Sequence, residues 1–151
     1  MSQSFPPIEV TMSFSDPQSA AWEPLLDAAW KAWDRAYAPY SGFHVGAALL
    51  RSDGSIVPGC NVENAAYPVT QCAERTAVCA AVSLGMQVGE LKALVVVTGA
   101  ESLTPPCGAC RQVLAEFAED LPILLANKHG RALHNINELL PHAFTGRNML
   151  P

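Results

Sequence analysis

The chain has 151 residues, half of them hydrophobic, and a formal net charge of −5. This length suits one domain whose core needs no disulfides, and nine scattered Lys and Arg residues are too few to hold a nucleic acid polymer. With no apolar segment long enough to span a bilayer and no secretory signal in residues 1–14, we expect a cytoplasmic protein that binds no membrane and whose ligand is small.

The first elements expected are a loose extension and a helix. Residues 1–20 are rich in Pro and Ser and show no periodicity, so we expect a loose N-terminal extension and a single domain over 21–151. Between Trp22 and Ala36 the apolar residues recur at three- and four-residue steps, which predicts a helix. Pro24 falls in its first turn, where its missing N–H is harmless.

Two strands and a second helix are expected next. The apolar run 43–51 predicts a buried strand, and 56–62 its partner across a tight turn at Ser52-Asp53-Gly54-Ser55. A helix is expected over 72–84, with Thr70 as its cap and a glycine at its end.

The second half of the chain continues this alternation. It predicts strands over 93–98, 121–126 and near Ala132, with helices over 107–118 and 136–140. Strands that alternate with helices predict a three-layer α/β/α sandwich with a mixed five-stranded sheet.

Three of the five cysteines stand at the starts of the two central helices. Cys107 and Cys110 are three residues apart and share a helix face, and thiolates are stabilised at helix N-termini. With Cys72 they offer three of the four ligands of a tetrahedral zinc ion. A site with three protein ligands and a water is typical of catalytic zinc.

Two charged residues follow Cys72. Glu74 lies in the same first turn, close enough to take a proton from the zinc-bound water as it becomes hydroxide. Three thiolates and one Zn²⁺ leave a negative centre, and Arg75 is placed to donate hydrogen bonds to the thiolates and draw charge from the metal.

Two other interpretations of the cysteines remain open here. A structural zinc module would need a fourth ligand, and a redox pair would use Cys-x-x-Cys alone. Candidates for a fourth ligand are His44, His129, His134, His142 and Cys60, whereas Cys79 lies too far along its helix from Cys72 to share an ion. We expect Cys60 and Cys79 to be buried free thiols.

From about Ala36 to Phe144 the chain resembles the small, homotetrameric, zinc-dependent cytidine deaminases. Cys-x-Glu followed by Pro-Cys-x-x-Cys is the signature of zinc nucleobase deaminases, with cysteine as first ligand in place of histidine. The resemblance is carried by the segments 37–41, 43–49, 59–65, 72–75 and 106–113.

The resemblance implies an activity and a catalytic centre. The activity is hydrolytic deamination of cytidine and deoxycytidine to uridine and deoxyuridine, with release of ammonia, in pyrimidine salvage. The centre would hold one zinc ion per subunit on Cys72, Cys107 and Cys110, and Glu74 would be the proton shuttle.

The resemblance also implies the substrate contacts. Phe43 would line the pyrimidine pocket, and Asn61 and Glu63 would hold the ribose 3′-hydroxyl. The backbone of Ala73 would contact the base carbonyl, and the carbonyl of Pro106 would accept a hydrogen bond from the exocyclic amine.

The family's quaternary structure implies shared active sites. Phe144 resembles the aromatic residue that a neighbouring subunit of the homotetramer lends to the pocket, and Tyr67 resembles a position near subunit contacts. The alternative substrate class is another aminopyrimidine nucleoside such as blasticidin S. Asn61 and Glu63 favour a ribose, and the Glu63 carboxylate disfavours a phosphorylated sugar.

Overall fold

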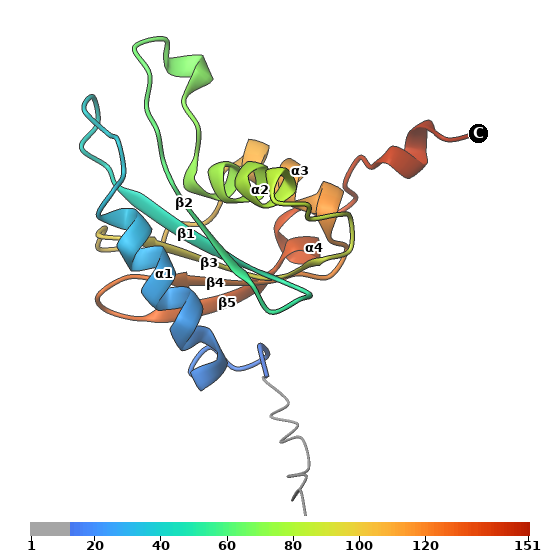
Figure 1. The fold of residues 1–151 in the computed structure, drawn as a ribbon, viewed down its shortest axis with the longest axis horizontal. Helices are drawn as coiled ribbons and strands as arrows, with labels where there is room; N and C mark the ends of the chain where they lie inside the picture. The colour runs from blue at the N-terminus through green and yellow to red at the C-terminus, as the bar shows by residue number, and fades with distance from the viewer. Residues whose placement is uncertain (1–12) are drawn as a thin grey trace, which may run out of the picture.

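The computed structural model describes residues 13–151, which form a single sheet with helices on both faces (Figure 1). The strand order is β2-β1-β3-β4-β5. Strands β3 and β4 are parallel, and the other neighbouring pairs are antiparallel. The strands are β1 (Val45–Arg51), β2 (Ile56–Cys60), β3 (Leu91–Thr98), β4 (Pro122–Ala126) and β5 (Arg131–Asn135).

The helices complete the three layers that the sequence predicts. Helix α1 covers one face of the sheet, and α2, α3 and α4 cover the other (Figure 1). Their bounds are Glu23–Trp33, Ala73–Ser83, Gly108–Phe117 and Ile136–Leu139. Three short 3-10 helices lie at Ala20–Trp22, Tyr67–Val69 and Gly146–Met149.

Two separate cores explain why the strands are continuously apolar in sequence. In β3, Leu94 and Val96 belong to the core beneath α2 and α3, while Val95 and Val97 belong to the core beneath α1. Successive side chains of a strand point to opposite faces, and a sheet covered on both sides must be apolar at both.

Helix α2 is held unusually close to the sheet. Its buried face is lined by small residues, among them Ala73 and Ala77, and it packs over Gly59 of β2. A Cβ atom at Gly59 would lie 2.5 Å from both the carbonyl oxygen of Ala73 and the backbone nitrogen of Ala77. The glycine therefore sets the depth at which the N-terminus of α2 rests on the sheet.

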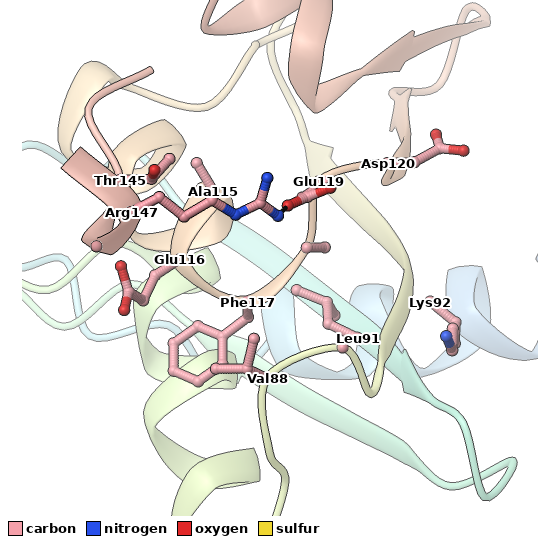
Figure 2. A pocket seen from close by; sticks show the side chains of 13 residues that line it. Val88, Leu91, Lys92, Ala115, Glu116, Phe117, Glu119, Asp120, Thr145 and Arg147 are labelled. Carbon is pink, nitrogen blue, oxygen red and sulfur yellow. Dashed lines mark ion pairs between the residues drawn. The ribbon is translucent and has the colours of Figure 1, made fainter. Parts of the chain in front are cut away.

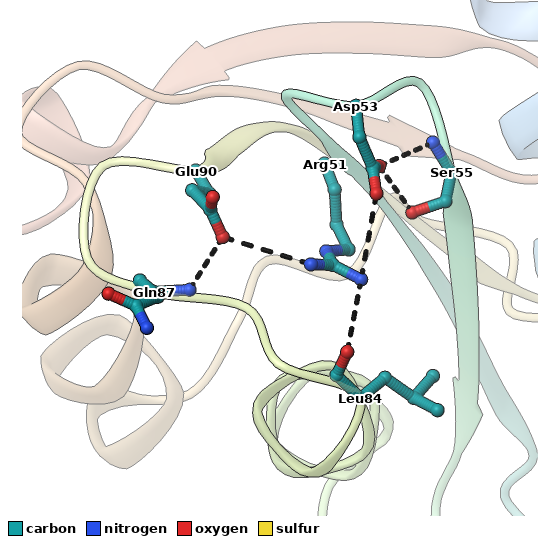
Figure 3. Close-up of polar contacts among 6 residues, drawn as sticks. All are labelled: Arg51, Asp53, Ser55, Leu84, Gln87 and Glu90. Carbon is teal, nitrogen blue, oxygen red and sulfur yellow. Dashed lines mark hydrogen bonds and ion pairs between the residues drawn. The ribbon is translucent and has the colours of Figure 1, made fainter.

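A half-buried arginine, Arg51, holds the opposite end of α2 in place (Figure 3). The Arg51 guanidinium lies 3.8 Å from the carboxylates of Asp53 and Glu90, and it donates a hydrogen bond of 3.5 Å to the carbonyl of Leu84. It thus joins the β1–β2 turn to the connection between α2 and β3.

Several element ends differ from the sequence prediction. Helix α1 ends at Trp33 because the chain then turns to form an isolated bridge between Tyr37 and Val62. The same bridge takes Val62 away from β1, so β2 ends at Cys60. The prediction of Thr70 as the cap of the second helix is wrong, since Cys72 occupies that position.

The predicted N-terminal extension falls partly outside the described residues, which begin at Ser13. Within the described part, Phe14 packs edge-on against Trp22 with ring centroids 4.8 Å apart. None of the helices in residues 13–151 has the length and apolar character needed to cross a membrane.

Candidate functional site

The chain path brings two helix N-termini together at one edge of the sheet. Helix α2 precedes β3 in the chain and α3 follows it. Both helices therefore begin near the carboxyl end of that strand. Cys72 is the N-cap residue of α2 and Cys107 that of α3, and neither side chain makes a capping hydrogen bond. Cys110 lies in the first turn of α3, so both helix dipoles favour negative charge at the sulfurs.

The three cysteines form one group of ligand atoms. Their sulfur atoms all lie within 4.8 Å of one another, and the Sγ atoms of Cys72 and Cys107 are 3.7 Å apart. Cys110 is buried, Cys72 half-buried and Cys107 exposed. In residues 13–151 no histidine, carboxylate or further cysteine joins this group.

The thiols of Cys72 and Cys110 favour opposite protonation states. The hydrogen bond with Cys110, aided by Arg75, lowers the pKa of Cys72 to about 5, whereas the same hydrogen bond, with burial, raises the pKa of Cys110. A divalent cation removes this conflict by stabilising all three as thiolates. The donor set therefore fits zinc, which prefers sulfur ligands.

Glu74 is a buried carboxylic acid beside the sulfurs. The residue is 4% exposed. Its Oε2 atom accepts a hydrogen bond of 3.7 Å from the Sγ atom of Cys110. Burial raises the pKa of Glu74. A carboxyl group of raised pKa is suited to both taking and giving a proton near neutral pH.

Arg75 places a positive charge against the sulfur group. Its Nη2 atom donates to the Sγ atom of Cys72 at 3.4 Å and to the carbonyl of Thr70 at 3.3 Å. Its Nε atom is buried without a hydrogen-bond partner among the described residues. A guanidinium drawn to thiolates in this way supports a site that carries net negative charge around a metal.

A cavity of about 450 Å³ reaches Thr70, which stands two residues before Cys72. Thr70 links the cavity to the cysteine group through Arg75, because its carbonyl accepts a hydrogen bond from the same Nη2 atom that donates to Cys72. The lining residues are Tyr40, Ser41, Phe43, Asn61, Glu63, Tyr67 and Thr70. Three of the predicted substrate contacts, Phe43, Asn61 and Glu63, therefore share one cavity.

Asn61 and Glu63 stand on the segment that follows β2. The Asn61 side chain is buried, where its Nδ2 atom donates to the carbonyl of Phe43 at 2.7 Å and its Oδ1 atom accepts from the backbone N–H of Val45 at 2.8 Å. The Glu63 carboxylate accepts hydrogen bonds from Ser41. Sequence reasoning gave Ser41 no role, since a lone serine in a turn carries no distinctive pattern.

Of the other predicted substrate contacts, Ala73 and Pro106 lie beside the sulfur group and Phe144 lies outside the cavity. Ala73 and Pro106 are buried beside the cysteines that they adjoin in sequence, and the carbonyl of Pro106 accepts a hydrogen bond of 2.8 Å from Nε of Arg111. Phe144 is 61% exposed and does not line the cavity of its own chain. Its carbonyl accepts a hydrogen bond of 2.8 Å from Gln112.

The remaining two cysteines correct a prediction. Both thiols are free, but Cys79 is exposed on α2 and Cys60 is only half-buried, so they are not the buried thiols expected. The Cys60 thiol donates a hydrogen bond of 3.7 Å to the carbonyl of Arg35. Neither sulfur belongs to the metal-ligating group.

Another cavity, of about 490 Å³, lies at the C-terminal end of α3 (Figure 2). Val88, Leu91 and Phe117 form its apolar part, and an ion pair between Arg147 and Glu119 crosses it. Its lining contains no cysteine, so it is separate from the cysteine group.

Comparisons with known proteins point to one family. The family described as the cytidine and deoxycytidylate deaminase zinc-binding region matches residues 21–124. A cytidine deaminase of Sporosarcina psychrophila is 49% identical over 84% of this chain and 93% of its own length. The crystal structure of cytidine deaminase from Burkholderia pseudomallei is 46% identical, with a TM-score of 0.78, and covers 80% of this chain and 97% of that one.

A relative named for a different substrate is less similar to this chain. The blasticidin-S deaminase of Bacillus cereus is 31% identical over 68% of this chain and 77% of its own length.

Proposed function

The chain belongs to the zinc-dependent cytidine and deoxycytidylate deaminase family, and from this premise we propose that it hydrolyses cytidine and deoxycytidine to uridine and deoxyuridine. Ammonia is the second product, and the reaction would serve pyrimidine salvage. The observation that carries the proposal is a group of three thiols with a buried carboxylic acid beside it, linked through Arg75 and Thr70 to a cavity of nucleoside size.

Cys72, Cys107 and Cys110 would hold one zinc ion per subunit. Three protein ligands leave a tetrahedral ion one position for a ligand that the protein does not supply. Zinc in such a site supplies Lewis acidity, which lets water lose a proton near neutral pH. The competition between the Cys72 and Cys110 thiols for charge supports this assignment.

Glu74 would carry every proton transfer. Its carboxylate takes a proton from the attacking water and gives it to N3 of the cytosine ring as the water oxygen bonds to C4. It then moves the second proton of that water to the amino group, and the bond between C4 and nitrogen breaks. One water is consumed and one ammonia leaves, so Glu74 ends the cycle unchanged.

Arg75 would moderate the charge of the thiolates. Three thiolates around a divalent cation sum to −1, and excess negative charge opposes the loss of a proton from water. Hydrogen bonds from a guanidinium draw electron density from the sulfur ligands, and the contact of 3.4 Å to Cys72 supports this role.

In the bound substrate, the base would lie against Phe43, and the sugar would contact Asn61 and Glu63. The backbones of Ala73 and Pro106 would meet the base carbonyl and the exocyclic amine. A carboxylate near the sugar repels a phosphate group, so Glu63 favours free nucleosides over nucleotides.

Phe144 would complete the pocket of a neighbouring subunit in a homotetramer. Its exposure and its position outside the cavity of its own chain support this arrangement. Exposed aromatic residues around the cavity, Tyr40 and Tyr67 among them, are typical of a subunit interface.

Subunit complementation tests the shared site. Phe144→Ala and Glu74→Gln chains should each be nearly inactive alone, and mixed oligomers refolded from both should regain activity, because some sites then combine intact residues from two chains. No activity in mixed oligomers of confirmed composition would refute the lending of Phe144.

A substrate panel tests the function itself. Ammonia release and loss of the cytosine absorbance band are measured with cytidine, deoxycytidine, deoxycytidylate and blasticidin S. Turnover of the two nucleosides well above that of the nucleotide and the antibiotic supports the proposal. Preference for blasticidin S, or zinc binding without ammonia release from any of the four, overturns it.

A further inference from the structure

Ser41 and Glu63 are hydrogen-bonded to each other in the lining of the cavity. Ser41 lies in the turn that follows α1, and Glu63 lies after β2. The backbone N–H of Ser41 donates to Oε1 of Glu63 at 3.1 Å, and the hydroxyl of Ser41 donates to the same oxygen at 2.7 Å. Both residues line the cavity.

The two carboxylate oxygens of Glu63 are unequally engaged. Oε1 accepts hydrogen bonds from both the N–H and the hydroxyl of Ser41, while Oε2 accepts only a longer hydrogen bond of 3.3 Å from the same N–H. Oε2 therefore keeps the greater acceptor capacity. A nucleoside hydroxyl in the cavity would find this oxygen as the less occupied acceptor.

The serine is itself held in place. Its Oγ atom accepts a hydrogen bond of 3.0 Å from the backbone N–H of Phe43, and the carbonyl of Phe43 accepts from the Asn61 side chain. The hydrogen bonds thus run from the residue beside the base to both residues beside the sugar.

We propose that Ser41 is a positioning residue for the sugar, which holds Glu63 so that Oε2 accepts the ribose 3′-hydroxyl. The inference rests on the proposed function, which puts the sugar at Glu63. An unrestrained glutamate loses rotamer freedom when it binds a ligand. Ser41 orders the carboxylate before the nucleoside arrives, so Ser41 lowers KM and leaves the chemical step unaffected.

The chain offers a matched control for this serine. In the β1–β2 turn, Ser55 donates to Oδ1 of Asp53 through its backbone N–H at 2.9 Å and its hydroxyl at 2.6 Å. This pair has the same chemistry and is also exposed, but it does not line the cavity. Ser55→Ala therefore removes an equivalent hydrogen bond away from the sugar.

The experiment compares two substrates that differ only in the 3′-hydroxyl, deoxycytidine and 2′,3′-dideoxycytidine. Ordering one side chain is worth roughly a 3- to 10-fold change in affinity, so Ser41→Ala should raise KM for deoxycytidine by that factor with kcat unchanged. For dideoxycytidine the change should stay below about 2-fold, because the interaction with Oε2 is absent. Ser55→Ala should alter neither value, and Ser41→Thr, which keeps the hydroxyl, should restore most of the loss.

Two results overturn the inference. An equal rise in KM for both substrates would mean that Ser41 only stabilises the turn, and a fall in KM for deoxycytidine would mean that Ser41 competes with the sugar. If the wild-type protein turned over neither nucleoside, the proposed function would fail instead. Calorimetric affinities of the same variants for the same two nucleosides would then decide the role of Ser41.

Discussion

Replacement of Glu74 by glutamine isolates the proton transfers from every other property of the site. The amide has the same shape as the carboxylate and fits a position that is 4% exposed. It removes only a weak contact, since the Cys110 sulfur lies 3.7 Å from Oε2. The variant should therefore fold, keep its zinc and bind cytidine, while no group remains that can take and return a proton.

The expected magnitude follows from the number of transfers. A single acid–base group contributes roughly 10²–10⁴-fold to a rate, and Glu74 would serve in successive transfers, so kcat should fall by at least about 10⁴-fold. Ammonia release is the assay, with zinc content and melting temperature measured on the same sample. Glu116→Gln is the control, because it makes the same change at an exposed position of α3. A Glu74→Gln enzyme that keeps a tenth of the wild-type kcat would refute the proton-shuttle role.

Two further substitutions test the charge and the packing of the site. Arg75→Ala should retain zinc yet lower kcat by roughly 10- to 100-fold, since it removes the hydrogen bond to a ligating sulfur; an unchanged kcat in steady-state assays would refute its role. Gly59→Ala should lower the free energy of unfolding by about 3 kcal/mol in urea titrations, because the new methyl group would meet the backbone of α2 at 2.5 Å. Gly130→Ala, with open space around it, should cost far less, and equal values for the two variants would contradict the close-packing argument.

The elements and the ligand set could be predicted because their signals are local. Apolar periodicity located all five strands and the main helices, and the spacing of Cys107 and Cys110 placed two sulfurs on one helix face. The meeting of Cys72 with this pair depends on how α2 and α3 flank β3, and the sequence supported it only through the ligand preference of zinc.

Features that depend on long-range contacts were missed. The end of β2 at Cys60 follows from the bridge between Tyr37 and Val62, and no local pattern marks it. Thr70 resembles a cap in sequence, but its hydroxyl instead accepts a hydrogen bond from the backbone N–H of Asn64 at 3.3 Å. The hydrogen bonds of Ser41 to Glu63 cross 22 positions of the chain and became visible only in three dimensions.

The most direct test of the account is a zinc titration of metal-free protein, with ammonia release from cytidine as the readout. Activity should be absent without metal, rise in proportion to added zinc, and stop rising at one zinc ion per chain. The same titration of Cys110→Ala should recover no activity. Full deamination by metal-free protein, or by the Cys110→Ala variant, would contradict the claim that three sulfur ligands and one metal ion form the catalytic centre.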